Sequence, residues 1–205
     1  RGKLVQKHFA DKKQLLKLKY QWYMQDFMAC VASVDENMGR LLDYLDKNDL
    51  SNNTLVIYTG DQGFYLGENG WFDKRWMYDV SMQAPLLMRW PGKIKAGTIN
   101  NTLVQNIDFA PTMLNMASAS VPVAMQGLSL KLLITGKQSK LPRKYLYYHY
   151  YEYPIDHYVV PHLGIRGDRY KLIYFYTIGE WELYDLQTDP AEQKNLAGIE
   201  SYNSI

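Results

Sequence analysis

The feature that most constrains this chain is a short apolar run, TLVIYTG at residues 54–60, which breaks off into Asp61 and Gln62. The run is rich in β-branched residues and has turn-forming residues on both sides. This pattern is typical of a strand that is covered on both faces, as in a parallel sheet. A second apolar run, APLLMRW, follows at residues 84–90. Ligands of open α/β sheets bind where such strands end, so Asp61 and Gln62 are candidate binding residues.

Helical patterns flank the two apolar runs. Over residues 12–47, apolar side chains recur at alternating steps of four and three, which predicts one long helix with a single apolar face. That face consists of Phe27, Val31, Val34, Met38, Leu41 and Leu45. The segment NIDFAPTMLNMA at residues 106–117 predicts another helix, with Asn106 or Asp108 near its start. Pro111 would lie in its first turn, where proline is tolerated. Helix, strand, loop, strand and helix in this order indicate an α/β fold.

The composition changes near residue 140. Three segments that are dense in Tyr and β-branched residues and separated by turns predict a small antiparallel sheet. They span residues 144–153, 164–176 and 180–186. Pro190 begins the segment PAEQKNLAG, which we interpret as a short closing helix. The predicted domains are an α/β part over residues 1–140 and a small α+β part, antiparallel sheet plus helix, over residues 141–205.

Composition argues against several classes of function. The formal net charge is only +2 and there is no dense basic stripe, so no nucleic acid partner is expected. No apolar stretch approaches the roughly 20 residues of a membrane-spanning segment. The single cysteine, Cys30, rules out an intrachain disulfide and any multi-cysteine metal site. It falls among the apolar residues of the predicted long helix, which is typical of a buried structural cysteine.

The residues that follow the first apolar run suggest a site for a metal ion and an anion. The carboxylate of Asp61 and the carboxamide of Gln62 offer oxygen ligands, which suit Ca²⁺ or Mg²⁺ better than Zn²⁺. Lys74 follows after a short loop rich in glycine and aromatic residues, and it could meet an anion as a point charge. The alternative is an ordinary turn after a strand, with Lys74 in solvent.

Three separated motifs resemble the sulfatase family, within the alkaline-phosphatase superfamily. The stretch TLVIYTGDQGFYLGENGWFDKRWMYDVSMQAPLLMRWPG resembles the family's second signature region. NIDFAPTMLNMA resembles the helix that follows it, and WELYDLQTDPAEQKNLA resembles the closing segment. The resemblance runs from about residue 20 to about residue 198. It implies the C-terminal part of a sulfatase-like α/β sandwich, followed by a small antiparallel-sheet subdomain.

The resemblance also implies roles for individual residues. Asp61 and Gln62 would be ligands of a Ca²⁺ ion that holds the sulfate oxygens, and Lys74 would contact the sulfate directly. A divalent cation and a lysine together would stabilise the charge that develops during sulfate ester hydrolysis. The sequence departs from the family at two positions. Gln62 stands where relatives often have Asn or His, and Asn69 stands where many have His.

The family's nucleophile is a formylglycine made within a C-x-P/A-x-R motif, which this sequence lacks. CVASV at residues 30–34 matches the motif at Cys30 and Ala32 but has Val34 in place of the arginine. The paired acidic metal ligands of the family's first strand are absent as well. We therefore expect a truncated chain or a fragment. It should be inactive unless the missing N-terminal part of the same domain supplies the formylglycine.

The Tyr-rich segment suggests a substrate. Its skeleton, EYPxxHxVxxHxGIR, is most similar to sulfatases that act on N-acetylglucosamine 6-sulfate. We expect His157, His162 and Arg166 to contact a sulfated glycan of the glycosaminoglycan or mucin kind, because aromatic faces and fixed donors together suit sugars. The alternative is a packed sheet in which Tyr and His side chains satisfy one another.

Other functions stay open at this point. A phosphatase or phosphodiesterase of the same superfamily would use Zn²⁺ with several His and Asp ligands. None of the four histidines, His8, His149, His157 and His162, stands beside Asp61 in the sequence. A non-catalytic glycan-binding fragment is a third hypothesis. The resemblance also implies a periplasmic, secreted or lysosomal location.

Overall fold

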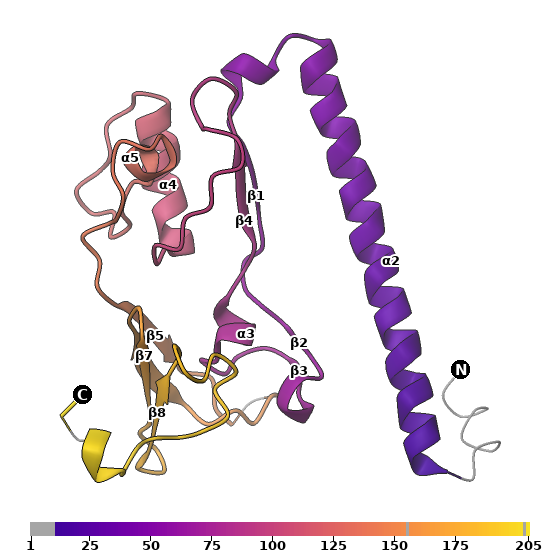
Figure 1. The fold of residues 1–205 in the computed structure, drawn as a ribbon, viewed down its shortest axis with the longest axis vertical. Helices are drawn as coiled ribbons and strands as arrows, with labels where there is room; N and C mark the ends of the chain where they lie inside the picture. Colours follow the sequence, from indigo (N-terminus) through magenta and orange to yellow (C-terminus); the bar gives the residue numbers. More distant parts are fainter. Residues whose placement is uncertain (1–10, 155, 203) are drawn as a thin grey trace. The chain divides into compact units, whose positions relative to one another are not determined.

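The computed structural model describes residues 11–154, 156–202 and 204–205, so His8 lies outside the described residues. Its contacts divide the chain into two units, Arg1–Thr54 and Leu55–Ile205, and each is described by itself (Figure 1). The boundary expected near residue 140 stays a prediction. Within the described ranges, no helix is both long enough and apolar enough to cross a membrane.

The first unit is built on one long helix. Helix α2 spans Lys12–Lys47, which confirms the predicted helix. Asp11 caps its first turn, because the Asp11 carboxylate accepts a hydrogen bond from the Lys13 N–H at 2.8 Å. At the other end the Leu50 N–H donates to the Leu45 carbonyl at 2.9 Å, and the 3₁₀ turn η1 (Ser51–Asn53) follows.

The expectation that Cys30 is buried is wrong. Cys30 is a free, exposed cysteine in the middle of α2. The neighbouring apolar positions Val31 and Val34 are 44% and 47% exposed. The sequence pattern identifies the apolar face of a helix, but burial also requires a surface to cover that face. Within its own unit, α2 packs with the short turn η1.

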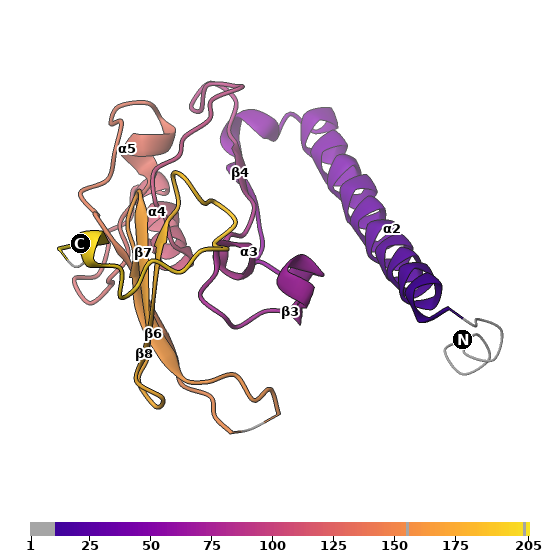
Figure 2. The ribbon, with the colours of Figure 1, turned by 60° about the horizontal axis from the view of Figure 1, so that its bottom comes forward.

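The two apolar runs form neighbouring strands, but these strands are antiparallel. Strand β1 (Val56–Thr59) pairs with β4 (Leu86–Arg89) in a two-stranded sheet, with Tyr58 opposite Leu87 (Figures 1 and 2). Tyr58 is 38% and Leu87 60% exposed. The expectation of a parallel sheet covered on both faces is therefore wrong for the described residues. An apolar run of four residues does not specify the direction or the cover of its partner.

The segment between β1 and β4 contains a small hairpin and one helical turn. Its elements are β2 (Tyr65–Leu66), the 3₁₀ turn η2 (Glu68–Gly70), β3 (Phe72–Asp73) and the one-turn helix α3 (Asp79–Met82). The turn after β1 lies directly against α3, since the Gly63 N–H donates to the Ser81 carbonyl at 2.8 Å. This approach is close because Gly63 has no side chain.

A buried ion pair organises the region after β4. Its helical elements are η3 (Asn106–Asp108), α4 (Phe109–Met116), which confirms the second predicted helix, and α5 (Lys131–Ile134). The Asp108 carboxylate is fully buried and binds both terminal nitrogens of Arg143 at 2.6 Å. It also accepts from the N–H groups of Gln105 and Leu128. Burial alone would raise the pKa of Asp108, but these partners hold it below its usual value.

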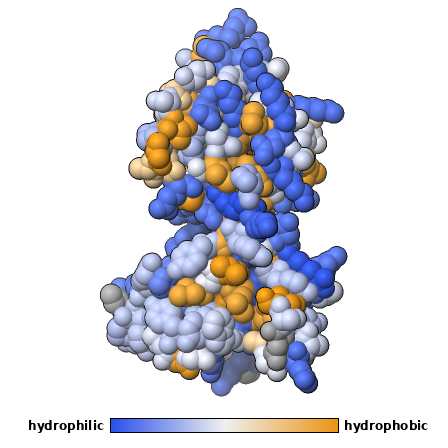
Figure 3. Space-filling view, turned by 90° about the vertical axis from the view of Figure 1, so that its left-hand side faces the viewer, coloured by the Kyte–Doolittle hydropathy of each residue, from blue (hydrophilic) through white to orange (hydrophobic). Residues whose placement is uncertain are grey.

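The Tyr-rich segments form an antiparallel sheet, as predicted, and this sheet has four strands. Its strands, in spatial order, are β5 (Leu146–Tyr150), β6 (His162–Arg166), β7 (Tyr170–Phe175) and β8 (Glu180–Asp185). One face of the sheet packs Ile173, Phe175 and Tyr184 against Met77 and Tyr78 from the α3 region. In the lower part of the view in Figure 3, hydrophobic patches on the surface lie among pale areas of intermediate hydropathy.

The closing helix predicted at PAEQKNLAG is wrong, because residues 190–198 form turns. The Asp189 carboxylate accepts from the N–H groups of Gln193 and Lys194, both at 2.8 Å. Glu192 has a φ of 54°, a left-handed conformation that an α-helix does not contain. Its side chain reaches Lys171 in β7, so a tertiary contact overrides the local helix signal. The 3₁₀ turn η4 (Glu200–Tyr202) follows.

Replacing Asp108 with Asn should lower the free energy of unfolding by about 3 to 5 kcal/mol at pH 7, because it leaves Arg143 without its buried partner. The folded-state pKa of Asp108 is lowered. Its stabilisation is therefore fully present above the unfolded pKa of about 3.9 and is lost as the pH falls through the folded value. Urea unfolding of the unchanged protein and of Asp108→Asn should show that their difference in free energy of unfolding is smaller at pH 3 than at pH 7.

The control for this variant is Asp43→Asn. It removes an exposed carboxylate that lies 3.9 Å from Lys47 on α2, and such exposed pairs contribute little. The prediction would be contradicted if Asp108→Asn lowered the free energy of unfolding by no more than Asp43→Asn does.

Replacing Gly63 with Ala should lower the melting temperature. A Cβ atom at this position would lie 2.1 Å from the Val80 carbonyl oxygen and 2.9 Å from the Ser81 carbonyl carbon, so backbone must move. Gly39→Ala is the matched control, since nothing lies within 4 Å of its Cβ and an interior helical position should gain about 0.5–1 kcal/mol. Thermal unfolding followed by circular dichroism measures both. An unchanged melting temperature for Gly63→Ala would overturn this account of the turn.

Candidate functional site

The predicted metal-binding and anion-binding segments meet around the single turn of α3. The Ser81 carbonyl accepts from the Gly63 N–H at 2.8 Å, and the Ser81 hydroxyl accepts from the Arg75 N–H at 3.0 Å. Ser81 is fully buried. One residue of α3 thus fixes both the turn that follows Gln62 and the backbone that follows Lys74.

Asp61 and Gln62 follow the end of β1, as predicted. Asp61 is exposed and makes no hydrogen bond or ion pair with any residue that the structure describes, while Gln62 is half-buried. An unengaged carboxylate beside a carboxamide fits the oxygen ligands that Ca²⁺ prefers. Calcium takes about six to eight oxygens, so these two residues supply part of such a site. In the described ranges, no group of three or more His, Cys, Asp and Glu side chains could hold a metal ion.

Lys74 lies directly after β3, between Asp73 and Arg75. Its Nζ is 3.5 Å from Asp73 Oδ1 and its side chain is 34% exposed, so the ammonium group is oriented and still reachable. The Arg75 guanidinium binds the other carboxylate oxygen, Asp73 Oδ2. Burial of Asp73 would raise its pKa, but Arg75 and Lys74 hold the pKa below its usual value. Asp73 and Arg75 have backbone φ angles of 79° and 107°, which residues other than glycine rarely adopt.

Arg75 joins the Lys74 segment to the Tyr-rich segment. Its carbonyl accepts from the Tyr148 hydroxyl at 2.9 Å, and its guanidinium contacts His157 Nε2. Strained backbone persists where the surroundings hold it in place, and it gathers at functional sites. The structure thus brings His157 to the same group as Lys74. Asp73 and Arg75 were not among the residues predicted for the site, although charged residues on both sides of Lys74 could have indicated an ion-pair network there.

His162 lies in the aromatic core and not in this group. Its ring is fully buried and stacks on the rings of Trp76 and Tyr150, with centroids 5.6 Å away in both cases. Its Nδ1 is 2.8 Å from the Val160 carbonyl oxygen and donates to it in the neutral tautomer. Burial lowers the pKa of His162, which favours this neutral form. A direct contact between His162 and substrate stays a prediction.

Arg166 lies at the other end of β6. Its guanidinium is 3.2 Å from Asp79 Oδ2, and with Arg169 and Gln187 it lines a separate cavity of about 420 Å³. Arg166 therefore has different partners from His157, which lies before β6 and contacts Arg75. The contact between Arg166 and a substrate also stays a prediction.

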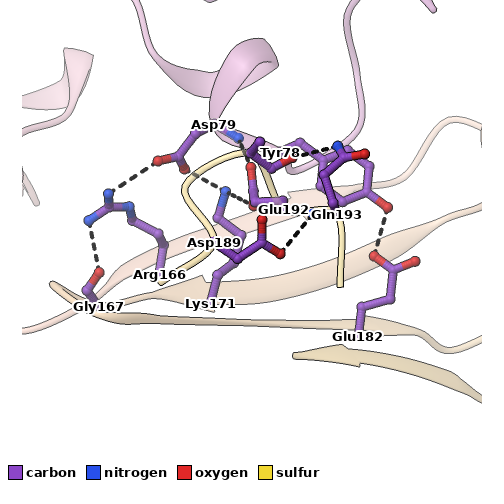
Figure 4. A network of polar contacts seen from close by, with 10 residues as sticks. Tyr78, Asp79, Arg166, Gly167, Lys171, Glu182, Asp189, Glu192 and Gln193 are labelled. Carbon is purple, nitrogen blue, oxygen red and sulfur yellow. Dashed lines mark hydrogen bonds and ion pairs between the residues drawn. The ribbon is translucent and has the colours of Figure 1, made fainter. Parts of the chain in front are cut away.

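A buried charge network fastens α3 to the sheet (Figure 4). Lys171 of β7 is 1% exposed, and its Nζ lies 2.5 Å from Asp79 Oδ1 and 2.7 Å from Glu192 Oε1. The Asp79 N–H donates to Glu192 Oε2 at 2.6 Å. No local pattern in the sequence indicates this network, because Lys171 and Glu192 are 92 and 113 residues from Asp79.

Family models match both parts of the chain. The model described as Sulfatase matches residues 5–119, and the one described as N-sulphoglucosamine sulphohydrolase, C-terminal, matches residues 67–205. Together they cover the candidate site and the antiparallel sheet.

Individual relatives agree with these matches. An N-acetylglucosamine-6-O-sulfatase of Bacteroides thetaiotaomicron is 50% identical over 194 residues, which are 93% of this chain and 35% of that protein. An arylsulfatase of Clostridium perfringens is 31% identical over 98% of this chain and 41% of its own length.

Solved structures give the same result. A protein in complex with its substrate, D-glucosamine-2-N,6-O-disulfate, superposes with a TM-score of 0.92 at 48% identity, over 98% of this chain and 41% of that one. A phosphonate monoester hydrolase from Silicibacter pomeroyi superposes with a TM-score of 0.73 at 26% identity, over 83% and 36%.

The chain thus spans between 35% and 41% of the length of these relatives. Two family models that each match more than half of its residues, and a 50% identical relative that covers 93% of it, confirm the resemblance noted in the sequence. The chain belongs to the sulfatase family.

Proposed function

We propose that this chain forms part of the active site of a carbohydrate sulfatase, a sulfuric ester hydrolase that acts on 6-O-sulfated glucosamine units of glycosaminoglycan or mucin glycans. The observation that carries the proposal is the meeting of two segments at Ser81. One segment carries the oxygen ligands Asp61 and Gln62, and the other carries the cation Lys74.

In this proposal Lys74 contacts the sulfate group. Its ammonium offers three donors to the sulfuryl oxygens, on which negative charge develops as the ester bond breaks. Asp73 orients Lys74 from 3.5 Å without covering it. Because the pair is partly exposed, a bound sulfate can approach the free side of the ammonium group.

Asp61 and Gln62 would hold a Ca²⁺ ion. When bound, this ion supplies positive charge to the sulfate oxygens. The two residues provide a charged and a neutral oxygen ligand at the end of β1, so other ligands must complete the site. The nucleophile in this proposal is a formylglycine outside these 205 residues.

Arg75 and His157 would face the sugar that carries the sulfate. They contact each other across 82 residues of sequence, and both are adjacent to the Lys74 segment. Donors in this position could bind the hydroxyl groups next to the sulfate ester. The names of two relatives support this sugar: one is an N-acetylglucosamine-6-O-sulfatase, and the other binds a glucosamine disulfate as its substrate.

A second candidate is hydrolysis of a phosphate or phosphonate ester. The likeness to a phosphonate monoester hydrolase supports it, because phosphonate and sulfate groups are both oxyanions that the same cations can bind. Comparing sulfate release with phosphate release from matched esters separates the two candidates.

The role of Lys74 can be tested in a chimera in which this chain replaces the matching region of the Bacteroides relative and the formylglycine is formed. We expect release of sulfate from N-acetylglucosamine 6-sulfate with Ca²⁺ present. Lys74→Ala should reduce kcat/KM by about a hundredfold or more, as loss of a charge-stabilising donor does. Lys95→Ala, on an exposed turn, is the control and should leave the rate unchanged. An active chimera that is indifferent to Lys74→Ala would refute the assignment.

The role of Asp61 predicts a change in the dependence on calcium. Asp61→Ala should raise the Ca²⁺ concentration that gives half-maximal rate by about tenfold or more, because one charged ligand is lost. Titration of the chelator-treated chimera with Ca²⁺ measures this, with Asp26→Ala on α2 as the control. Equal calcium dependence in the two variants would exclude Asp61 as a ligand.

A further inference from the structure

A turn near the C-terminus contacts segments that border the candidate site. This C-terminal turn, residues 189–196, touches two segments of the first half of the second unit. Glu192 accepts from the N–H of Asp79 at 2.6 Å (Figure 4). Gln193 Nε2 donates to Asn69 Oδ1 at 2.5 Å. The C-terminal turn therefore borders the β2–β3 hairpin at its tip, where η2 contains Asn69, and the helix α3 at its beginning.

The C-terminal turn is held in a strained shape. Glu192 adopts a φ of 54° although it is not glycine, and its side chain is 2% exposed. The Asp189 carboxylate fixes the turn by accepting from two N–H groups. Strain of this kind costs of order 1–3 kcal/mol and persists only when other contacts determine it. Here those contacts are the ones that Glu192 makes with Lys171 and with Asp79.

The ion pair between Lys171 and Glu192 is buried, so its free energy includes the cost of removing both charges from water. Burial raises the pKa of Glu192, and Lys171 acts in the opposite direction. Two charges removed from water gain little net stability from each other, since their desolvation offsets their attraction. Such pairs can instead fix one arrangement among several, because an ion pair tolerates a narrower geometry than apolar packing does.

The helix α3 needs such a fixed point. It is a single turn, and a helix of that length has no stability of its own. Asp79 begins it, and Ser81, two residues later, binds the N–H groups of Gly63 and Arg75. We therefore expect a shift of Asp79 to move Ser81 as well, and with it the backbone that follows Gln62 and the backbone that follows Lys74.

We propose that Lys171 and Glu192 are positioning residues for Lys74. Their buried pair fastens the C-terminal turn to the start of α3, and α3 holds the backbone next to Lys74 through Ser81. The catalytic consequence rests on the proposed function, whereas the mechanical linkage does not.

The mechanical linkage is tested by amide hydrogen exchange in this chain. The double variant Lys171→Met with Glu192→Leu removes both charges, so that neither is left alone in the interior. We expect the amides of Gly63 and Arg75 to exchange at least about tenfold faster, while those of Leu172 and Ile173 in the sheet keep their rates. Arg169→Met is the control, since the ion pair that it removes joins Arg169 to Asp185 and includes no residue of α3. Unchanged exchange at Gly63 and Arg75 would overturn the proposal.

A milder variant keeps the test decisive if the double variant loses its fold. Glu192→Gln retains the shape of the side chain and an acceptor for the Asp79 N–H but removes the charge that faces Lys171. It must show a smaller rise in exchange at the same two amides. No rise at either amide in this variant would also overturn the linkage.

The catalytic consequence is tested in the chimera. The double variant should lower kcat by about tenfold or more and change KM by less than about threefold, because misplaced Lys74 loses transition-state contacts more than binding contacts. A faster exchange together with an unchanged kcat would refute the positioning role. Absence of sulfate release from every chimera, with the exchange result intact, would count against the proposed function and not against the linkage.

Discussion

The ion pairs of Lys171 are the interaction on which the arrangement of the second unit depends. The Lys171 ammonium lies in the interior between Asp79 and Glu192, with both oxygens within 2.7 Å. It connects the sheet, the helix α3 and the C-terminal turn, three segments that have no regular hydrogen-bonded ladder in common. Since an unpaired buried charge is very unfavourable, these three segments must assemble together.

The candidate site follows from that assembly. Its candidate ligands Asp61, Gln62 and Lys74 lie in the segments that follow β1 and β3, and α3 holds the backbone next to them through Ser81. The two neighbours of Lys74, Asp73 at the end of β3 and Arg75, have left-handed backbone, and contacts with Tyr148 and His157 keep Arg75 in place. A site made of turns can present a carboxylate, an amide and an ammonium group to one ligand. Because its residues lie outside regular helices and sheets, such a site also needs a rigid support.

Much of the fold could be predicted from the sequence. The long helix α2 follows from a periodic apolar pattern, the helix α4 lies within its predicted segment, and the Tyr-rich segments form an antiparallel sheet as predicted. The same patterns did not give the direction of β4 beside β1, the exposure of Cys30 or the left-handed Glu192. Each of these depends on a partner segment, which a local pattern does not describe.

The sequence by itself determined the family, the elements and the residue types at the end of β1 and after β3, because these depend on short motifs and on local backbone preference. Only the tertiary structure decided which of the candidates meet. It joined His157 to the Lys74 segment through Arg75, enclosed His162 in an aromatic core and paired Arg166 with Asp79. The physical reason is that the contacts of Arg75 with His157 and of Asp79 with Arg166 bridge 82 and 87 residues of sequence. Their geometry depends on the burial of Lys171 and of the aromatic rings, which a local pattern does not describe.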